Sequence, residues 1–123
     1  MTARSDILTQ DDVRLLVHMF YGGIDAHPVL GRFFADLDLP GHLPRMVAFW
    51  SSVVFQTGTY HGRPFDAHVR LEGLAAEHFA AWLARFEATV DRLFAGPNAE
   101  TVKARAHQIG FIFQAKLGLL ATT

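Results

Sequence analysis

The sequence contains no cysteine among its 123 residues. Disulfide bonds, metal sites built from thiolates and cofactors attached covalently through sulfur are therefore excluded. This composition is compatible with a reducing cytosol, and any cofactor has to be held by other side chains. Because the chain has the length of one domain and half of its residues are hydrophobic, we expect a single domain, residues 1–123, around one buried core.

A strong charge of one sign and long apolar runs are also lacking. The formal net charge is −1 and the 11 lysine and arginine residues are scattered, which offers little attraction to nucleic acid or to an anionic membrane. No run approaches the length of about 20 apolar residues that spans a bilayer, and the first residues have no apolar signal-peptide core. We therefore expect a soluble cytoplasmic protein that binds neither nucleic acid nor membranes.

Familiar catalytic and metal-binding motifs are missing as well. The sequence has no Gly-x-Ser-x-Gly elbow, phosphate-binding loop, His-Glu-x-x-His motif, acidic calcium loop or dinucleotide-binding glycine pattern. These absences argue against hydrolases and nucleotide-binding proteins. None of the seven histidines forms an i, i+4 pair, so a zinc site would need ligands that are distant in sequence.

Strand patterns are nearly absent, and apolar residues recur instead at helical spacing, which predicts an all-α fold. The predicted helices run from Thr9, as N-cap, to His27, from about 42 to 57, from 75 to 95 and from 98 to 119, with a short helical piece from about 64 to 71. The stretch DLPGH, residues 38–42, is expected to break the chain. Gly22 and Gly23 fall inside the first predicted helix, where each costs about 0.5–1 kcal/mol relative to alanine. Close approach of another helix is expected to compensate for that cost.

Large rings are abundant, with 11 phenylalanines, two tryptophans and two tyrosines. Such residues are usually plain core. Four polar groups, however, lie on or beside the apolar faces of different helical pieces: Tyr21, His42, His68 and Trp82. Since buried donors and acceptors need partners, one in each of several helices indicates convergence on something other than a side chain. An iron porphyrin fits, because it needs an apolar slot, one imidazole on the iron and a few donors on the opposite face.

These residues occur in motifs that resemble the truncated haemoglobins, specifically group III. The motifs MFYGGI, LGRFFADL, GHLPRMVAFW, YHGRPFDAHVRL and HFAAWLARF follow the order and approximate distances of that family over residues 13–117. His42 lies eight residues before Trp50, and His68 lies fourteen before Trp82. The glycine pairs of the other groups are missing from their expected places, which agrees with group III. The resemblance implies an all-α, globin-like two-over-two helical sandwich that holds haem b noncovalently.

The resemblance also implies a role for each residue. His68 matches the proximal histidine that ligates the haem iron, and Tyr21, His42 and Trp82 match distal residues that face the bound ligand. The implied cofactor-binding residues are Phe34 packed on the porphyrin, Met46 over the iron, Arg45 at the rim beside a propionate, and Phe49, Leu71 and Phe79.

Simpler roles stay open at several positions. His42 could instead be a core histidine that has found a hydrogen-bond partner, and His68 a surface or capping histidine. Tyr21 and Trp82 would serve as packing residues in any helical protein, and Arg45 as an exposed arginine. If His42 does face the ligand, it could hold it, swing out as a gate, or bind the iron itself.

Two donors such as the Tyr21 hydroxyl and the Trp82 indole would each contribute about 1.5–3 kcal/mol to dioxygen binding. Dioxygen release would then slow by about 10²–10⁴. Slow release disfavours delivery, so we expect redox chemistry with nitric oxide, nitrite or peroxide, with a reductase as electron donor. Two alternatives are a haem-based oxygen-binding or sensing module without turnover, and a haem-free interaction protein with the globin fold.

Overall fold

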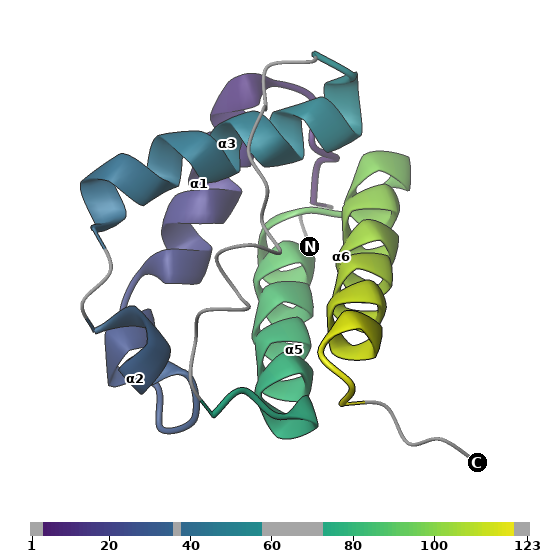
Figure 1. Cartoon of the computed structure of the whole chain (residues 1–123). Coiled ribbons are helices and arrows are strands. Elements are labelled where there is room, and N and C mark those ends of the chain that lie inside the picture. Colours follow the sequence, from purple (N-terminus) through teal and green to yellow (C-terminus); the bar gives the residue numbers. More distant parts are fainter. Residues whose placement is uncertain (1–3, 36–37, 58–72, 120–123) are drawn as a thin grey trace.

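The computed structural model of the chain describes residues 4–35, 38–57 and 73–119 (Figure 1). The elements in these ranges are α1 (Gln10–Tyr21), the 3-10 helix η1 (Ile24–Ala26), α2 (Gly31–Phe34), α3 (Leu39–Phe55), α5 (Ala76–Leu93) and α6 (Pro97–Lys116). These ranges contain no strand, so the predicted all-α fold is confirmed. The predicted short helix at residues 64–71 lies outside the described residues.

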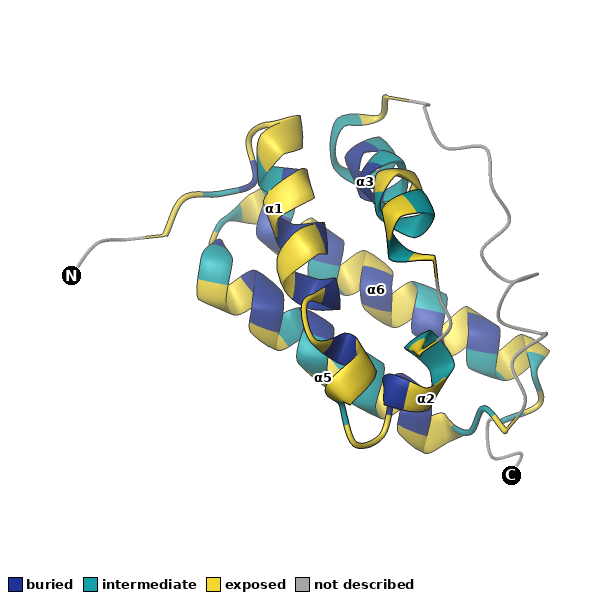
Figure 2. Cartoon of the chain, turned by 90° about the vertical axis from the view of Figure 1, so that its left-hand side faces the viewer, coloured by how far each residue is buried: buried dark blue, intermediate teal, exposed yellow. Residues whose placement is uncertain are grey.

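The long helices of the described chain form two layers of two. Helix α1 packs against α3, and α5 packs against α6, which runs back alongside it after the connection at residues 94–96 (Figure 1). Helix α1 also packs on α5, and α3 on α6, so the two pairs cover each other. Figure 2 shows that the buried faces of these helices are turned toward one another. This is the two-over-two sandwich that the resemblance implied.

Helix α1 begins where the sequence predicts. The Thr9 hydroxyl accepts a hydrogen bond from the Asp12 backbone N–H at 3.2 Å, and the Asp12 carboxylate accepts one from the Thr9 N–H at 3.0 Å. This reciprocal capping box satisfies two donors that the first turn of a helix leaves without partners. The apolar stripe of the helix is fully buried and comprises Val13, Leu16, Val17, Phe20 and Tyr21.

The predicted end of this helix is wrong. Helix α1 ends at Tyr21 and not at His27, because Gly22 is its C-cap and Gly23 adopts a left-handed φ of 75°. A Cβ on Gly23 would meet nothing within 4 Å, so close packing of another helix does not require a glycine there. The close approach occurs at Gly31, where a Cβ would lie 2.3 Å from the Asp25 carbonyl oxygen. Only glycine therefore lets α2 pack this tightly against η1.

Helix α3 also differs from its prediction, because it begins at Leu39 and DLPGH forms its first turn instead of a break. Asp38 is the N-cap, and its carboxylate accepts a hydrogen bond from the Gly41 N–H at 3.3 Å. Pro40 fits in the first turn because backbone N–H groups there have no partner inside the helix. At the other end, Gln56 caps the helix with a left-handed φ of 55°, so the helix stops at Phe55 and not near residue 58.

Helices α5 and α6 match their predicted ranges to within three residues at each end. They are joined through Gly96, which has a φ of 143°. The Asp6 carboxylate caps the start of α6 by accepting hydrogen bonds from the backbone N–H groups of Asn98 and Ala99, both at 2.9 Å. None of the helices within the described ranges is long and apolar enough to cross a membrane.

Candidate functional site

A cluster of stacked rings joins α1, α3 and α5. The Trp82 and Phe86 rings are stacked at 5.2 Å with 6° between their planes. Trp50 is also stacked on Phe86, at 4.8 Å with 24° between the planes. Phe20 meets Trp82 edge-on at 5.7 Å and Phe86 at 5.5 Å. We call these four residues, Phe20, Trp50, Trp82 and Phe86, the ring cluster. It forms a rigid apolar support from which the neighbouring side chain, Tyr21, projects.

Tyr21 and His42 form a polar pair beside this cluster. The Tyr21 hydroxyl oxygen lies 2.9 Å from His42 Nε2, and the two rings meet nearly perpendicular at 5.0 Å. Phe34 of α2 contacts the Tyr21 ring edge-on at 5.9 Å. Tyr21 is only 9% exposed, whereas His42 is half-buried. Helices α1, α2 and α3 thus bring three of the predicted site residues together.

The surroundings of Tyr21 keep its hydroxyl protonated. Burial raises the pKa of this phenol well above its usual value, because the phenolate would lose its hydration. When the His42 proton is on Nε2, His42 donates to the Tyr21 oxygen and leaves the phenolic O–H able to donate to a third group. In that tautomer, the pair can present the neutral Tyr21 O–H as a hydrogen-bond donor.

Among the described residues, Trp82 is connected to this pair through the ring of Phe20. Phe20 contacts Tyr21 at 4.9 Å and Trp82 at 5.7 Å, so it lies against both predicted distal residues. Trp82 is half-buried and is stacked as core tryptophans are. The geometry is therefore compatible with packing and with a distal role for its indole N–H.

The predicted cofactor-binding residues differ in their surroundings. Met46 and Phe49 are half-buried against the main core, and Phe79 is 6% exposed. Arg45 is exposed, and its Nε donates to the Gly41 carbonyl at 3.2 Å, one turn earlier in the same helix. The remaining predicted site residues, His68 and Leu71, lie outside the described residues.

Most of the other described histidines have structural or surface positions. The Nδ1 atoms of His27 and His78 accept hydrogen bonds from nearby backbone N–H groups. His107 pairs with a glutamate on the surface, and His18 is exposed. Within the described ranges, His42 is the histidine that contacts the buried tyrosine.

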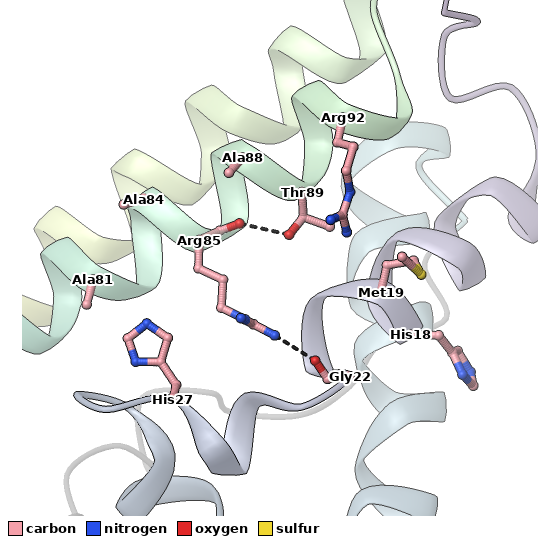
Figure 3. Close-up of a pocket in the computed structure, with 10 residues that line it drawn as sticks. All are labelled: His18, Met19, Gly22, His27, Ala81, Ala84, Arg85, Ala88, Thr89 and Arg92. Carbon is pink, nitrogen blue, oxygen red and sulfur yellow. Dashed lines mark hydrogen bonds between the residues drawn. The ribbon is translucent and has the colours of Figure 1, made fainter.

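Sequence reasoning missed one polar residue near the pair, Arg85 of α5. Its Nε donates to the Phe20 carbonyl at 2.9 Å and its Nη2 to the Gly22 carbonyl at 2.8 Å. Arg85 also borders a hollow of about 760 Å³ between α5 and the end of α1 (Figure 3). The available sequence signal for Arg85 was its position three residues after Trp82, on the next turn of the same helix. That spacing alone does not reveal a bond to a backbone carbonyl elsewhere in the chain.

Comparison with known proteins adds to this geometry. No family model matches the chain. A group 3 truncated haemoglobin of Campylobacter jejuni is 25% identical over 115 residues, which cover 89% of this chain and 91% of that protein. The crystal structure of a group III truncated haemoglobin from Campylobacter jejuni superposes with a TM-score of 0.82 at 24% identity, covering 93% of this chain and 94% of that one. In sequence and in fold, the chain therefore resembles the group III truncated haemoglobins over nearly its whole length, as its motifs predict.

Proposed function

We propose that the chain is a haem-binding globin that binds dioxygen and related small ligands beside the Tyr21–His42 pair. We further propose that it serves redox chemistry with nitric oxide, nitrite or peroxide instead of oxygen delivery. The observation that carries this proposal is the 2.9 Å contact between the Tyr21 hydroxyl and His42 Nε2, a polar pair set among aromatic side chains. The names of the sequence relative and of the solved structure, both truncated haemoglobins, support the haem-binding part of this proposal.

The residues that the structure describes fit a noncovalent haem b. A porphyrin needs apolar contacts on its faces, and Phe34, Met46, Phe49 and Phe79 are buried or half-buried apolar side chains. With no cysteine in the chain, an imidazole is the natural ligand for the iron, and we assign that role to His68. We assign Leu71 to the apolar wall on that side, and Arg45 to a propionate at the rim. When bound, the haem supplies an iron that coordinates small ligands and exchanges electrons.

The distal residues would act on the ligand as hydrogen-bond donors. Dioxygen held at the haem would carry partial negative charge, so a hydrogen bond donated by the Tyr21 O–H would be worth about 1.5–3 kcal/mol. His42, donating to the Tyr21 oxygen, polarises that O–H and strengthens its bond to the ligand. The Trp82 N–H is the second proposed donor. His42 thereby acts on the ligand through Tyr21, which makes it more than a core histidine with a satisfied bond.

Strong retention of the ligand favours reaction over delivery. Two such donors slow dioxygen release by about 10²–10⁴, because each 1.4 kcal/mol is worth about tenfold. Tyr21 and Trp82 would hold the ligand long enough for reaction with nitric oxide, and a bound haem would supply the redox chemistry for reduction of nitrite or peroxide. Turnover then requires an electron donor, which we propose to be a cytoplasmic reductase.

Haem loading of the purified chain tests the proposal. We expect one equivalent of added haem to give an intense Soret band, and the His68→Ala variant to lose stable haem or its histidine-ligated spectrum. His107→Ala is the matched control, because this histidine lies on the surface of α6. A wild-type chain that takes up no haem would contradict the proposal, and so would an unchanged spectrum in His68→Ala.

A further inference from the structure

Arg85 holds the backbone on both sides of Tyr21. Its Nε donates to the carbonyl of Phe20, the residue before Tyr21, and its Nη2 donates to the carbonyl of Gly22, the residue after it. Figure 3 shows the side chain reaching from α5 to the end of α1. One guanidinium thus clamps the peptide segment that carries the tyrosine.

The end of α1 needs such a clamp. The last carbonyls of a helix have no partner within it and form the negative end of its dipole, so a guanidinium there is favourable. The chain then leaves the helix through Gly22 and Gly23, the latter with a left-handed φ of 75°. Glycine adopts many backbone conformations at little cost, so these two residues by themselves do not fix the orientation of Tyr21.

The same helix holds the preceding residue of α1 as well. The Arg85 guanidinium carbon lies 5.7 Å from the centre of the Phe20 ring, and the Trp82 ring contacts Phe20 from one turn earlier on α5. Phe20 is 2% exposed, so it has little freedom to move. Helix α5 therefore grips the last turn of α1 through a ring contact and two charge-assisted hydrogen bonds.

We propose that Arg85 is a positioning residue for the distal pair, fixing the last turn of α1 so that the Tyr21 hydroxyl meets His42 Nε2. The effect on ligand binding rests on the proposed function, whereas the effect on the Tyr21–His42 geometry does not. Arg85 itself touches neither side chain of the pair in the contacts described above. Its influence passes through the backbone of Phe20 and Gly22.

The first readout is the geometry of the pair. We expect nuclear Overhauser contacts between the Tyr21 and His42 ring protons in the wild-type chain. The purified chain is reduced under carbon monoxide before the measurement. Arg85→Met keeps the aliphatic stem but removes both donors, and should weaken or abolish these contacts. Arg92→Met is the matched control, because Arg92 lies on α5 and borders the same hollow. This substitution should leave the Tyr21–His42 ring contacts unchanged. Reduction under carbon monoxide makes the iron of any bound haem diamagnetic, so these contacts can be measured whether or not the chain carries haem.

The second readout is dioxygen release from the ferrous protein. We expect Arg85→Met to release dioxygen about 10-fold faster, since a displacement of about 1 Å in a positioned group can cost up to about 100-fold. In the Tyr21→Phe background the same substitution should change the rate less than twofold, because no hydroxyl remains to be displaced. Arg85→Lys, which keeps the charge but can replace only part of the fork, should lie between wild type and Arg85→Met.

The results that overturn the inference differ from those that overturn the proposed function. If folded Arg85→Met keeps the ring contacts, or accelerates release equally with and without the Tyr21 hydroxyl, Arg85 is not a positioning residue. If Arg85→Met fails to fold, the same criteria apply to Arg85→Lys. If wild type takes up no haem, the proposed function fails, and the ring contacts still decide the inference.

Discussion

The hydroxyl oxygen of Tyr21 lies 2.9 Å from Nε2 of His42, across the contact between α1 and α3. Tyr21 is nearly inaccessible, and burial raises its pKa, so the phenol stays neutral. A neutral hydroxyl that accepts from an imidazole can still donate its own proton. This relationship ties the fold to the proposed ligand chemistry.

His42 should act on a bound ligand through Tyr21. Replacing His42 by leucine removes the donor to the Tyr21 oxygen, and we expect dioxygen release about 2- to 10-fold faster, as for one neutral hydrogen bond of about 0.5–1.5 kcal/mol. In the Tyr21→Phe background, His42→Leu should have little further effect. Stopped-flow measurement of the four proteins gives the coupling. Equal effects in both backgrounds would refute action through Tyr21, and a faster association rate alone would assign His42 to a gate.

Asp6 should stabilise the fold in a pH-dependent manner. Desolvation raises its pKa, but hydrogen bonds from the backbone N–H groups of Asn98, Ala99 and Ile7 outweigh it, so the pKa lies below the ordinary value of 3.8. A lowered pKa in the folded state means that this stabilisation is present above about pH 4 and is lost as the pH falls through the folded value. We expect Asp6→Ala to cost about 0.5–2 kcal/mol at pH 7, as for removal of a helix cap. Urea unfolding of both proteins at pH 7 and near pH 2 measures this, and a pH-independent difference would contradict it.

Gln56 offers a stabilising substitution. It caps α3 with a left-handed φ of 55°, a conformation that glycine adopts without strain. Gln56→Gly is expected to raise the free energy of unfolding by up to about 1 kcal/mol. Gln108→Gly is the control, because the same change inside α6 should destabilise the protein. Thermal unfolding followed by circular dichroism decides the sign for each variant, and a lower midpoint for Gln56→Gly would show that its side chain contributes more than its backbone strain costs.

Gly31 should tolerate no side chain. A Cβ there would lie 2.3 Å from the Asp25 carbonyl oxygen, so Gly31→Ala has to push α2 away from η1. We expect a loss of about 1–3 kcal/mol in stability, as for overpacking. Gly118→Ala is a comparison at an open position, where a Cβ meets nothing within 4 Å and only the left-handed φ is strained. Equal losses for the two variants would show that the contact with Asp25 is relieved easily.

The sequence predicted the long helices because their signals are local or periodic, whereas the two-over-two layering was implied by the resemblance of its motifs to the truncated haemoglobins. Thr9 is the N-cap of α1 as predicted, and the apolar stripe of the helix is buried. The end of α1 was missed because Gly22 and Gly23 carry no apolar signal that separates a helix interior from its end. The start of α3 was missed because Pro40 both breaks helices and begins them.

Sequence reasoning could predict the candidate site only where a polar residue stands out on an apolar helix face. Tyr21 and His42 were singled out as polar groups on apolar faces, and the structure brings them together. Arg85 could not be found in this way, because its partners are backbone carbonyls 65 and 63 residues earlier in the chain. An arginine on a half-exposed helix face has the same pattern whether it is solvated or bound to a distant backbone group. The roles of all the predicted site residues toward a haem and its ligand remain predictions.

The most direct test of the central claim is the rate of dioxygen release from the ferrous protein with and without the Tyr21 hydroxyl. Tyr21→Phe keeps the ring and its contacts with Phe20 and Phe34. We expect release to accelerate by about 10- to 100-fold, corresponding to the loss of one hydrogen bond of about 1.5–3 kcal/mol to a charged group. A haem-loaded Tyr21→Phe protein that releases dioxygen at the wild-type rate would show that the Tyr21–His42 pair does not face the ligand.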